Sequence, residues 1–366
     1  MNRTIGLIST NYSLPGLGEL AEKRAPASVP FGGRYRLIDF ALSNMVNSHI
    51  HTVGVITPYY YRSVLDHVGA GKPWGLDRKD GGLFIMPGGA YGFKEEDSRF
   101  LLRDFIRNRA YFDLQDGDYV LVTGGTAVMN VDYLPLIEHQ EISGAQVTLL
   151  CRKTPADYTR AGWYVSADDK GCVQSLQRGE TGEYQFLESF IINKALLKRL
   201  MADYRARSQV DIMTILSELL ADIRIDVQLF EGYVGFVDTL PEYMRVSREL
   251  LDGAVRRELF LGDRRIMTKI HDTPPAFYVP GANVKNAVMT AGSIVEGEVS
   301  DSIVFRNARI EKNAVVKNCV LLEKCTIREG AHLEYVICDK RVEVSPGTVI
   351  IGTPEHPCVL PRQETV

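Results

Sequence analysis

The sequence lacks three features that would place the protein in a special class. None of its apolar runs approaches the ~18 residues that a membrane span needs. Its first residues, MNRTIGLISTNYS, contain no long apolar segment of the kind found in secretory signals. Lysine and arginine together number 42 against 46 acidic residues, so there is no basic excess for general nucleic-acid binding. We expect a cytoplasmic protein that binds neither membranes nor nucleic acids.

The six cysteines form no metal-binding pattern. None belongs to a CxxC or CxxxC pair, and no His-x3-His accompanies them, which argues against a zinc site. We expect most of them to be small buried apolar residues rather than disulfide partners. The sequence therefore predicts no metal ion and no cofactor.

The first half of the chain alternates short apolar runs with segments of helical period. This alternation predicts an α/β domain of the Rossmann-like kind, with a mostly parallel mixed sheet and helices on both faces. Ligands of such sheets bind at the carboxyl ends of the strands. The expected strands are residues 3–9, 51–57, 118–123 and 145–151, and the expected helices are residues 35–47, 100–114 and 133–142.

From Val279 onward the helical period stops, and aliphatic residues recur every six positions. A six-residue period over some 60 residues is typical of a left-handed parallel β-helix, the hexapeptide repeat, in which each face of a triangular coil points one aliphatic side chain inward. Two in-phase series disfavour a β-sandwich with accidental spacing. The series are Val304, Ile310, Val316, Leu322 and Val315, Leu321, Ile327, Leu333, with Gly292, Gly297, Asn307, Asn313 and Gly330 as turn formers between them.

These patterns predict two domains joined by a helical linker. Thr239 and Glu242 stand three residues apart at the start of the linker helix, the spacing of a capping box, and Pro241 suits the first turn. The expected parts are the α/β domain at residues 1–240, the linker at 241–278, the β-helix at 279–355 and an irregular tail at 356–366.

Residues 23–44, KRAPASVPFGGRYRLIDFALSN, carry the most specific motif. Together with the C-terminal repeat, this segment closely resembles the bacterial glucose-1-phosphate adenylyltransferases (ADP-glucose pyrophosphorylases) of glycogen synthesis. The resemblance continues in residues 51–77, 129–140 and 237–251 and covers essentially the whole chain. It implies a nucleotidyltransferase domain followed by a β-helix. In this family a phosphate oxygen of glucose 1-phosphate attacks the α-phosphorus of ATP, and pyrophosphate leaves.

The phosphate-binding parts of the family are altered in this sequence. Such chemistry needs backbone N–H groups from a glycine-rich loop, basic side chains on the leaving phosphates and Mg²⁺ held by carboxylates. The paired loop glycines fall on Asn11 and Tyr12, and a loop arginine falls on Ser13. A tyrosine side chain would block close approach of the backbone to a phosphate. The phosphate-binding lysine falls on Pro26.

The metal-binding carboxylates of the family are also replaced. They fall on Thr126 and Phe236, and a hydroxyl is a weaker magnesium ligand than a carboxylate. Asp238 lies two residues beyond Phe236, so a shifted alignment would recover that one carboxylate. The residues that still match a sugar-phosphate site are Gly162 and Arg178.

At least four catalytic parts are missing together, and the loss of one preorganised charge-stabilising group typically costs roughly 10²–10³ in rate. The resemblance is therefore to the GlgD type of companion subunit. It implies a regulatory subunit that joins a catalytic glucose-1-phosphate adenylyltransferase in a hetero-oligomer, a tetramer, and modulates it. Three alternatives stay open: an active transferase with an atypical loop, a hexapeptide-repeat acyltransferase that has only His332 as its base, and a stand-alone sugar-nucleotide sensor.

Four basic residues of the 23–44 motif are retained although substrate residues are not. In the family the matching positions contribute to an anion site between the two domains, which implies a sugar-phosphate or nucleotide effector. The alternative is that they form ion pairs with Glu19, Glu22 or Asp39. Glu334, where the family often has a basic residue, would repel a phosphate. The candidate effector residues are Lys23, Arg24, Arg34 and Arg36.

Overall fold

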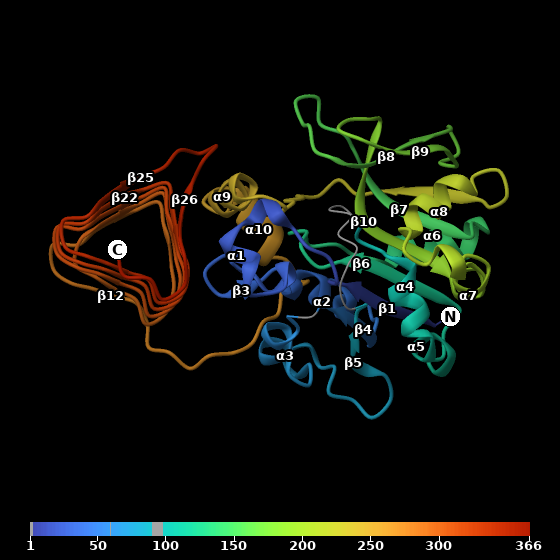
Figure 1. Cartoon of the computed structure of the whole chain (residues 1–366), viewed down its shortest axis with the longest axis horizontal. Helices are drawn as coiled ribbons and strands as arrows, with labels where there is room; N and C mark the ends of the chain where they lie inside the picture. The colour runs from blue at the N-terminus through green and yellow to red at the C-terminus, as the bar shows by residue number, and fades with distance from the viewer. Residues whose placement is uncertain (1–2, 59, 90–97) are drawn as a thin grey trace.

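Two parts of the chain lie side by side, an α/β domain and a triangular prism of short strands (Figure 1). This computed structural model describes residues 3–58, 60–89 and 98–366. Within those residues, no helix has the length and apolar character needed to cross a bilayer. The six cysteines are all free thiols, four of them buried.

The α/β domain is built on a nine-stranded mixed sheet whose central strands are β1 (Thr4–Ser9), β4 (Thr52–Thr57) and β6 (Tyr119–Gly124). These three are parallel to one another. The expected mostly parallel mixed sheet is confirmed, because antiparallel pairing is confined to β10 and the hairpin beside it. The remaining strands are β5 (Gly82–Pro87), β7 (Val147–Lys153), β8 (Gly162–Ala167), β9 (Val173–Gly179), β10 (Tyr184–Asn193) and β11 (Ile225–Leu229), and the order is β11-β7-β10-β6-β1-β4-β5 with β8 on β10 and β9 on β8.

Helices cover both faces of this sheet through two separate apolar clusters. The expected helix at residues 100–114 is two helices that meet at Asn108. The Asn108 amide donates to the carbonyls of Asp104 and Pro87, a side-chain contact that competes with the helical backbone bonds. The helices are α1 (Glu19–Glu22), α2 (Ile38–Asn47), α3 (Arg62–Val68), α4 (Leu102–Arg107), α5 (Arg109–Leu114), α6 (Leu134–Ser143), α7 (Lys194–Asp203) and α8 (Ile212–Glu218).

The linker contains two helices, α9 (Leu240–Glu249) and α10 (Gly253–Phe260). The capping box expected at α9 is confirmed: the Thr239 hydroxyl accepts the Glu242 N–H at 3.3 Å, and the Glu242 carboxylate accepts the Thr239 N–H at 3.0 Å. These two hydrogen bonds fix the N-terminus of α9 at Thr239.

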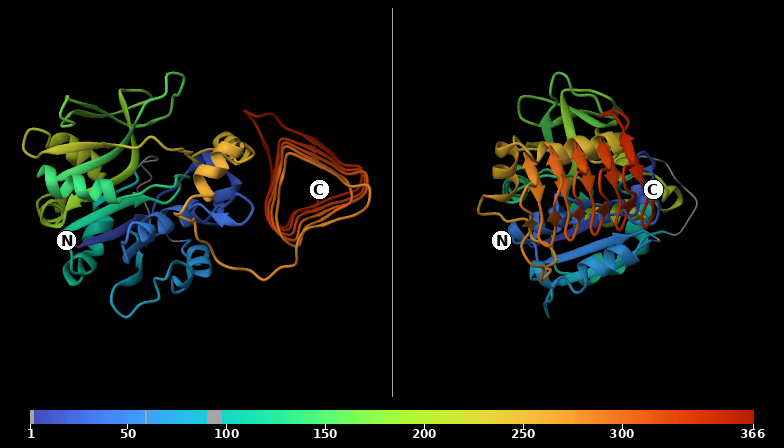
Figure 2. Two further views of the ribbon diagram at one scale, coloured as in Figure 1. Left: turned by 180° about the vertical axis from the view of Figure 1, so that it is seen from behind. Right: turned by 90° about the vertical axis from the view of Figure 1, so that its left-hand side faces the viewer.

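The C-terminal part is a parallel β-helix with three five-stranded sheets, seen along its axis in Figure 1 and from the side in Figure 2. Asn307 and Asn313, two of the turn formers, have left-handed backbone angles with φ of 57° and 58° at the corners of coils. The strands are β12 (Phe277–Tyr278), β13 (Asn283–Lys285), β14 (Val288–Met289), β15 (Ile294–Val295), β16 (Glu298–Ser300), β17 (Ile303–Val304), β18 (Arg309–Ile310), β19 (Val315–Lys317), β20 (Val320–Leu321), β21 (Thr326–Ile327), β22 (His332–Glu334), β23 (Val336–Cys338), β24 (Glu343–Val344), β25 (Val349–Ile351) and β26 (Cys358–Leu360).

The length of the coils corrects the expected inward series. Parallel pairing joins Val299 to Val316 and Val316 to Leu333, so a later coil takes 17 residues (316 − 299) rather than 18. One face of each coil therefore advances by five residues and two faces advance by six. Consequently Val315 is only half-buried, and Leu322 packs toward the α/β domain instead of into the coil core. Six of the eight expected residues do lie in the coil core.

The end of the chain differs from the irregular tail expected at residues 356–366. Strand β26 pairs in parallel with β23, and Thr365 forms a bridge to Glu343. The last residues thus cover the final coil, because its backbone groups need partners as much as those of the earlier coils.

One face of the β-helix packs against the α/β domain. Its outward residues Ile303, Val320 and Ile337 share an apolar cluster with Phe31 of the first domain and Tyr243 of α9. The Tyr243 hydroxyl also donates to the Pro30 carbonyl at 2.8 Å. This apolar contact fixes how the two domains face each other.

We predict that the coil core carries much of the stability of the C-terminal domain. Ile327→Ala should lower the free energy of unfolding by about 2–5 kcal/mol, because it leaves a cavity where the side chain is fully buried. Val349→Ala is the matched control, since that side chain is 63% exposed and should change the stability by less than about 0.5 kcal/mol. Denaturant unfolding followed by circular dichroism measures both, and equal effects of the two substitutions would contradict the packing described.

Candidate functional site

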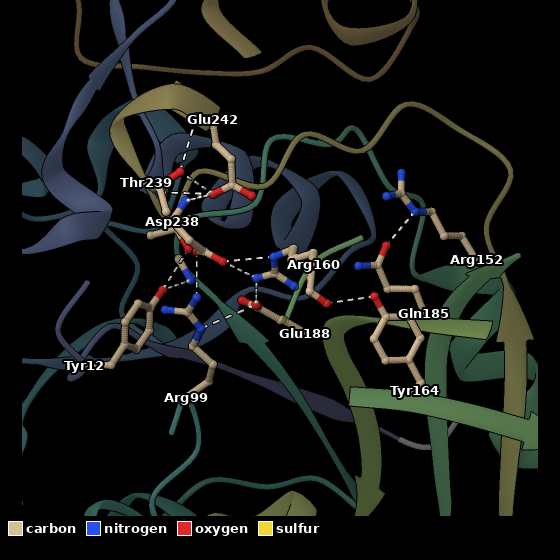
Figure 3. A network of polar contacts seen from close by, with 12 residues as sticks. Tyr12, Arg99, Arg152, Arg160, Tyr164, Gln185, Glu188, Asp238, Thr239 and Glu242 are labelled. Atoms are coloured by element: carbon tan, nitrogen blue, oxygen red, sulfur yellow. Dashed lines mark hydrogen bonds and ion pairs between the residues drawn. The ribbon is translucent and has the colours of Figure 1, made fainter. Parts of the chain in front are cut away.

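The loop after β1 is filled by its own tyrosine. The Tyr12 hydroxyl donates to the Thr126 hydroxyl at 3.3 Å and accepts the Gly125 N–H at 3.0 Å. The Arg99 guanidinium lies over the Tyr12 ring, 4.4 Å from its centroid. Figure 3 shows this ring beside the polar network of the cleft. The backbone N–H of Gly125, at the carboxyl end of β6, thus binds a side chain rather than a ligand.

Asn11 holds the same loop against α4. Its amide donates to Asp104 Oδ2 at 2.7 Å, and Asp104 Oδ1 accepts the Gly89 N–H at 2.6 Å. Burial raises the pKa of the Asp104 carboxyl despite these hydrogen bonds. Ser13 follows in the loop and is half-buried. The loop is therefore held by side-chain contacts that leave no glycine-lined cradle.

The other altered positions carry no charge into the cleft. Pro26 is buried, begins a short 3-10 helix (Pro26–Ser28) and has no N–H to donate. Thr126 is fully buried, and its hydroxyl accepts the hydrogen bond from Tyr12. Where the resemblance implies a lysine, the structure thus has the uncharged ring of Pro26, and where it implies a carboxylate, it has the Thr126 hydroxyl.

Four charged side chains close the cleft, and we call them the four-charge network: Arg99, Arg160, Glu188 and Asp238 (Figure 3). Arg99 Nη2 lies 2.6 Å from Asp238 Oδ1, and Arg160 Nε lies 2.9 Å from Asp238 Oδ2. Glu188 Oε1 lies 2.7 Å from Arg160 Nη2 and 3.4 Å from Arg99 Nε. These ion pairs therefore bring together four segments that are far apart in the sequence.

The opposite charges of the network favour the ionised forms of Arg99, Arg160 and Asp238. Burial alone would lower the pKa values of both guanidinium groups, yet the carboxylates of Asp238 and Glu188 outweigh burial and raise them. Burial alone would raise the pKa of the Asp238 carboxyl, but Arg160 and Arg99 hold it below its usual range. Two positive and two negative charges cancel, so the network offers no surplus charge to a triphosphate.

The residues at the family's metal positions do not fit a magnesium ion. Phe236 is fully buried, and the Arg160 guanidinium lies 3.7 Å from its ring centroid. Asp238 does face the cleft, as a shifted alignment suggested, but two arginines occupy its oxygens. Across residues 3–58, 60–89 and 98–366, no three His, Cys, Asp or Glu side chains gather as metal ligands.

Gly162 and Arg178, the two residues predicted to remain from a sugar-phosphate site, line one cavity. This cavity adjoins the four-charge network, and Arg178 lies over the Trp163 ring at 5.9 Å. The cavity measures about 30 Å³. The Asp238 carboxylate already binds the Arg99 and Arg160 guanidinium groups beside this cavity, so these cations are not available to a nucleotide while the network stays closed.

A second cavity of about 70 Å³ lies between the two domains, and we call it the interdomain pocket. Its walls carry five basic and two acidic side chains, an excess of three positive charges (5 − 2). The acidic residues are Asp66 and Glu323, and His67 and His271 also face the pocket. The basic residues are Arg34 and Arg36 of the first domain, Lys269 of the linker, and Arg306 and Lys340 of the β-helix.

Only two of the four candidate effector residues reach this pocket. Arg34 and Arg36 line it, whereas Lys23 is exposed outside its lining. Arg24 is buried and pairs with Asp339 of the β-helix at 2.5 Å, rather than with the acidic neighbours considered from the sequence. It thus joins the two domains directly.

The acidic residue that the β-helix contributes to the pocket also differs from expectation. Glu334 pairs with Lys317 on another face of the β-helix at 3.0 Å. Glu323 lies at the pocket instead.

Sequence reasoning missed the residues that form both polar clusters. Arg99, Arg160 and Glu188 belong to no motif, and 28 to 139 residues separate the partners of their contacts. Glu323 and Lys340 also carry no local signal. The 17-residue repeat could have indicated that they occupy equivalent positions on successive coils, but only after the coil length was known.

We predict that Asp238 is needed for stability rather than for chemistry. Asp238→Asn should lower the free energy of unfolding by about 3 kcal/mol, because it leaves two buried arginines with one carboxylate. Asp113→Asn is the control, since Asp113 forms an exposed pair with Lys198 and its loss should have little effect. Denaturant unfolding at pH 7 compares the two.

We also predict how the stability difference between wild type and Asp238→Asn depends on pH. Because the folded pKa of Asp238 is depressed, its contribution is complete above the unfolded pKa of about 4 and is lost as the pH falls through the lower folded pKa. The stability difference between wild type and Asp238→Asn should therefore be constant from pH 8 to about pH 5 and shrink below it. A difference that grows on acidification would contradict the ion pairing.

Comparison with known proteins agrees with this architecture. The family model described as "Nucleotidyl transferase" matches residues 17–244, and "GlmU-like, C-terminal hexapeptide" matches residues 275–356. The chain is 32% identical over 360 residues to "Glycogen biosynthesis protein GlgD" of Bacillus subtilis, covering 98% of this chain and 96% of that protein. It is 34% identical over 365 residues to the protein of the same name from Geobacillus stearothermophilus, covering 100% and 97%.

Proteins named for the enzymatic activity are also similar. The chain is 30% identical over 380 residues to "Glucose-1-phosphate adenylyltransferase" of Halalkalibacterium halodurans, covering 93% of this chain and 97% of that protein. It is 31% identical over 327 residues to the protein of that name from Thermotoga neapolitana, covering 87% and 77%. The chain therefore belongs to the glucose-1-phosphate adenylyltransferase family of nucleotidyl transferases.

Proposed function

We propose that this chain is a catalytically degenerate regulatory subunit of glycogen biosynthesis, one that binds a catalytic glucose-1-phosphate adenylyltransferase and modulates it. The observation that carries the proposal is the closed cleft: Tyr12 fills the phosphate loop, and the charges of the four-charge network compensate one another. Relatives named for glycogen biosynthesis, similar over nearly the whole chain, support the assignment to that pathway. A cytoplasmic location is part of the same proposal.

The size of the expected rate losses favours an inactive chain over a weakly active enzyme. Adenylyl transfer depends on positioned cations and a metal ion that stabilise charge on the phosphates. Here the loop donor is taken by Tyr12, the lysine position is Pro26 and the metal positions are Thr126 and Phe236. Losing one such group typically costs roughly 10²–10³ in rate. Even without strict multiplication, several losses together leave no useful turnover.

Two observations bear on the alternatives. An active transferase would need the four-charge network to open, which would leave buried charges without partners. An acyltransferase would need a histidine base in a loop between coils, but His332 lies within strand β22. At the first coil of the β-helix, strands β12, β13 and β14 are edge strands of their sheets. Such edges favour association, and we propose a tetrameric hetero-oligomer with the catalytic subunit.

The proposed mode of regulation uses the interdomain pocket. A sugar phosphate or nucleotide would place its phosphate among cations from both domains and so couple ligand binding to the contact between the domains. Burial lowers the pKa of the Arg36 guanidinium, the mark of a cation whose lost hydration is incompletely replaced. An incoming phosphate would supply the missing counter-charge.

An activity assay tests the regulatory role. The isolated chain should release no pyrophosphate from ATP and glucose 1-phosphate, whereas typical enzymes turn over at ~1–10³ per second. Added in equal amount to a catalytic glucose-1-phosphate adenylyltransferase subunit, it should change the maximal rate or the response to effectors at least twofold. The control is the catalytic subunit alone at the same total concentration. Normal turnover by the isolated chain, or an unchanged partner, would overturn the proposal.

Calorimetry tests the effector pocket. Arg36→Gln should weaken the binding of glucose 1-phosphate about tenfold, because it removes a charged hydrogen-bond donor from a partly dry site. Arg328→Gln is the matched control, since Arg328 pairs with Glu311 and Glu343 on the outside of the β-helix. Equal affinities of wild type and Arg36→Gln would place the ligand elsewhere.

A further inference from the structure

Three charged residues form a ladder along one corner of the β-helix, and we call Arg306, Glu323 and Lys340 the charge ladder. They stand 17 residues apart (323 − 306 and 340 − 323), the length of one coil, so they occupy equivalent positions on three successive coils. Glu323, in the middle, contacts the Arg306 guanidinium above and the Lys340 ammonium below, the latter at 2.7 Å. All three line the interdomain pocket.

The cations across the pocket have no such carboxylate partner. Arg36 donates to the Ser63 carbonyl at 2.5 Å, and Lys269 donates to the Asp66 carbonyl at 2.8 Å. Arg34 lies beside the Tyr35 ring at 5.6 Å. Among the residues that the structure describes, none of these three cations forms an ion pair with a carboxylate. Glu323 is thus the carboxylate that the two ladder cations share, while the opposite wall has three cations and only one lining carboxylate, Asp66.

The ladder is tightly held yet accessible. Burial alone would raise the pKa of the Glu323 carboxyl, but Lys340 and Arg306 outweigh burial and lower it to about 2, so the group is ionised at neutral pH. Burial lowers the pKa of Lys340. The Glu323 side chain is still 24% exposed, so a ligand in the pocket can reach its oxygens. A carboxylate in this place bonds to the same donors that a phosphate oxygen would use.

We propose that Glu323 is a built-in counter-anion of the interdomain pocket, which a phosphate group must displace from Arg306 and Lys340 in order to bind. The inference rests on the effector role proposed for this pocket. Glu323 would then set the affinity: while it holds both ladder cations, only ligands with enough negative charge to replace it bind well. A phosphate monoester dianion fits this condition better than a carboxylate or a neutral sugar.

Displacement would also transmit binding to the fold. The ladder belongs to the β-helix, whereas Arg34 and Arg36 belong to the first domain. A phosphate between the two walls replaces an ion pair within one domain by contacts that span both. Phosphate binding would therefore change the contact between the two domains, beside the Arg24–Asp339 pair that already joins them.

Phosphate binding to charge variants of the full chain tests the proposal. Calorimetry with inorganic phosphate is run at pH 8, where His271 is largely neutral because burial lowers its pKa. Glu323→Gln should bind phosphate about tenfold tighter than wild type, because it removes a like charge next to the ligand and frees both cations. Glu343→Gln is the matched control, since Glu343 pairs with Arg328 on the outer surface, and its affinity should equal that of wild type.

A second variant guards against misfolding. If Glu323→Gln fails to fold, as judged by its thermal transition, Glu323→Asp keeps the charge but draws the carboxylate back from Arg306 and Lys340. It should bind phosphate two- to fivefold tighter. Affinity that is unchanged or weaker in a folded variant, or no measurable binding by any of these proteins, would overturn the proposal.

The outcome is separable from that of the regulatory role. Tighter phosphate binding by Glu323→Gln supports the counter-anion even if the chain leaves the rate of a catalytic partner unchanged. A changed partner rate with identical phosphate binding by wild type and Glu323→Gln overturns the counter-anion and leaves the regulatory role standing.

Discussion

A buried charge needs a partner, and this requirement governs both polar clusters of the molecule. In the cleft, Arg99 and Arg160 meet Glu188 and Asp238, and four side chains from distant parts of the chain become fully compensated. A nucleotidyl transferase needs the opposite condition there, with positive charge held ready for a triphosphate. These ion pairs join four distant segments of the α/β domain.

The interdomain pocket shows the same requirement met only in part. Its basic residues outnumber its acidic ones, and the single carboxylate of the charge ladder serves two cations at once. An uncompensated cluster at a domain contact is costly unless an anion completes it. The contrast between a neutral cleft and a positive pocket therefore moves the expected site of ligand binding from the sheet edge to the domain boundary.

The architecture explains how this shift leaves the fold intact. The helices on both faces of the sheet and the apolar contact of the β-helix are held by large apolar clusters, to which the cleft residues Tyr12 and Phe236 also contribute. Tyr12, Pro26 and Phe236, at positions where the resemblance implies phosphate- or metal-binding residues, are each accommodated by local contacts. Chemistry and folding are in this sense separable, which is how one fold comes to serve different functions.

The sequence by itself determined the alternation of strands and helices, the capping box of α9 and the repeat of the C-terminal domain, because each depends on neighbours within a few residues. It also predicted that the loop positions Asn11, Tyr12 and Ser13 are unsuited to phosphate binding. Only the tertiary structure decided that Asp238 is held by Arg99 and Arg160, that coils of 17 residues align Arg306 with Glu323, and that β26 completes the last coil. These contacts join residues far apart in the chain, and their partners are chosen by packing geometry and charge compensation rather than by any local pattern.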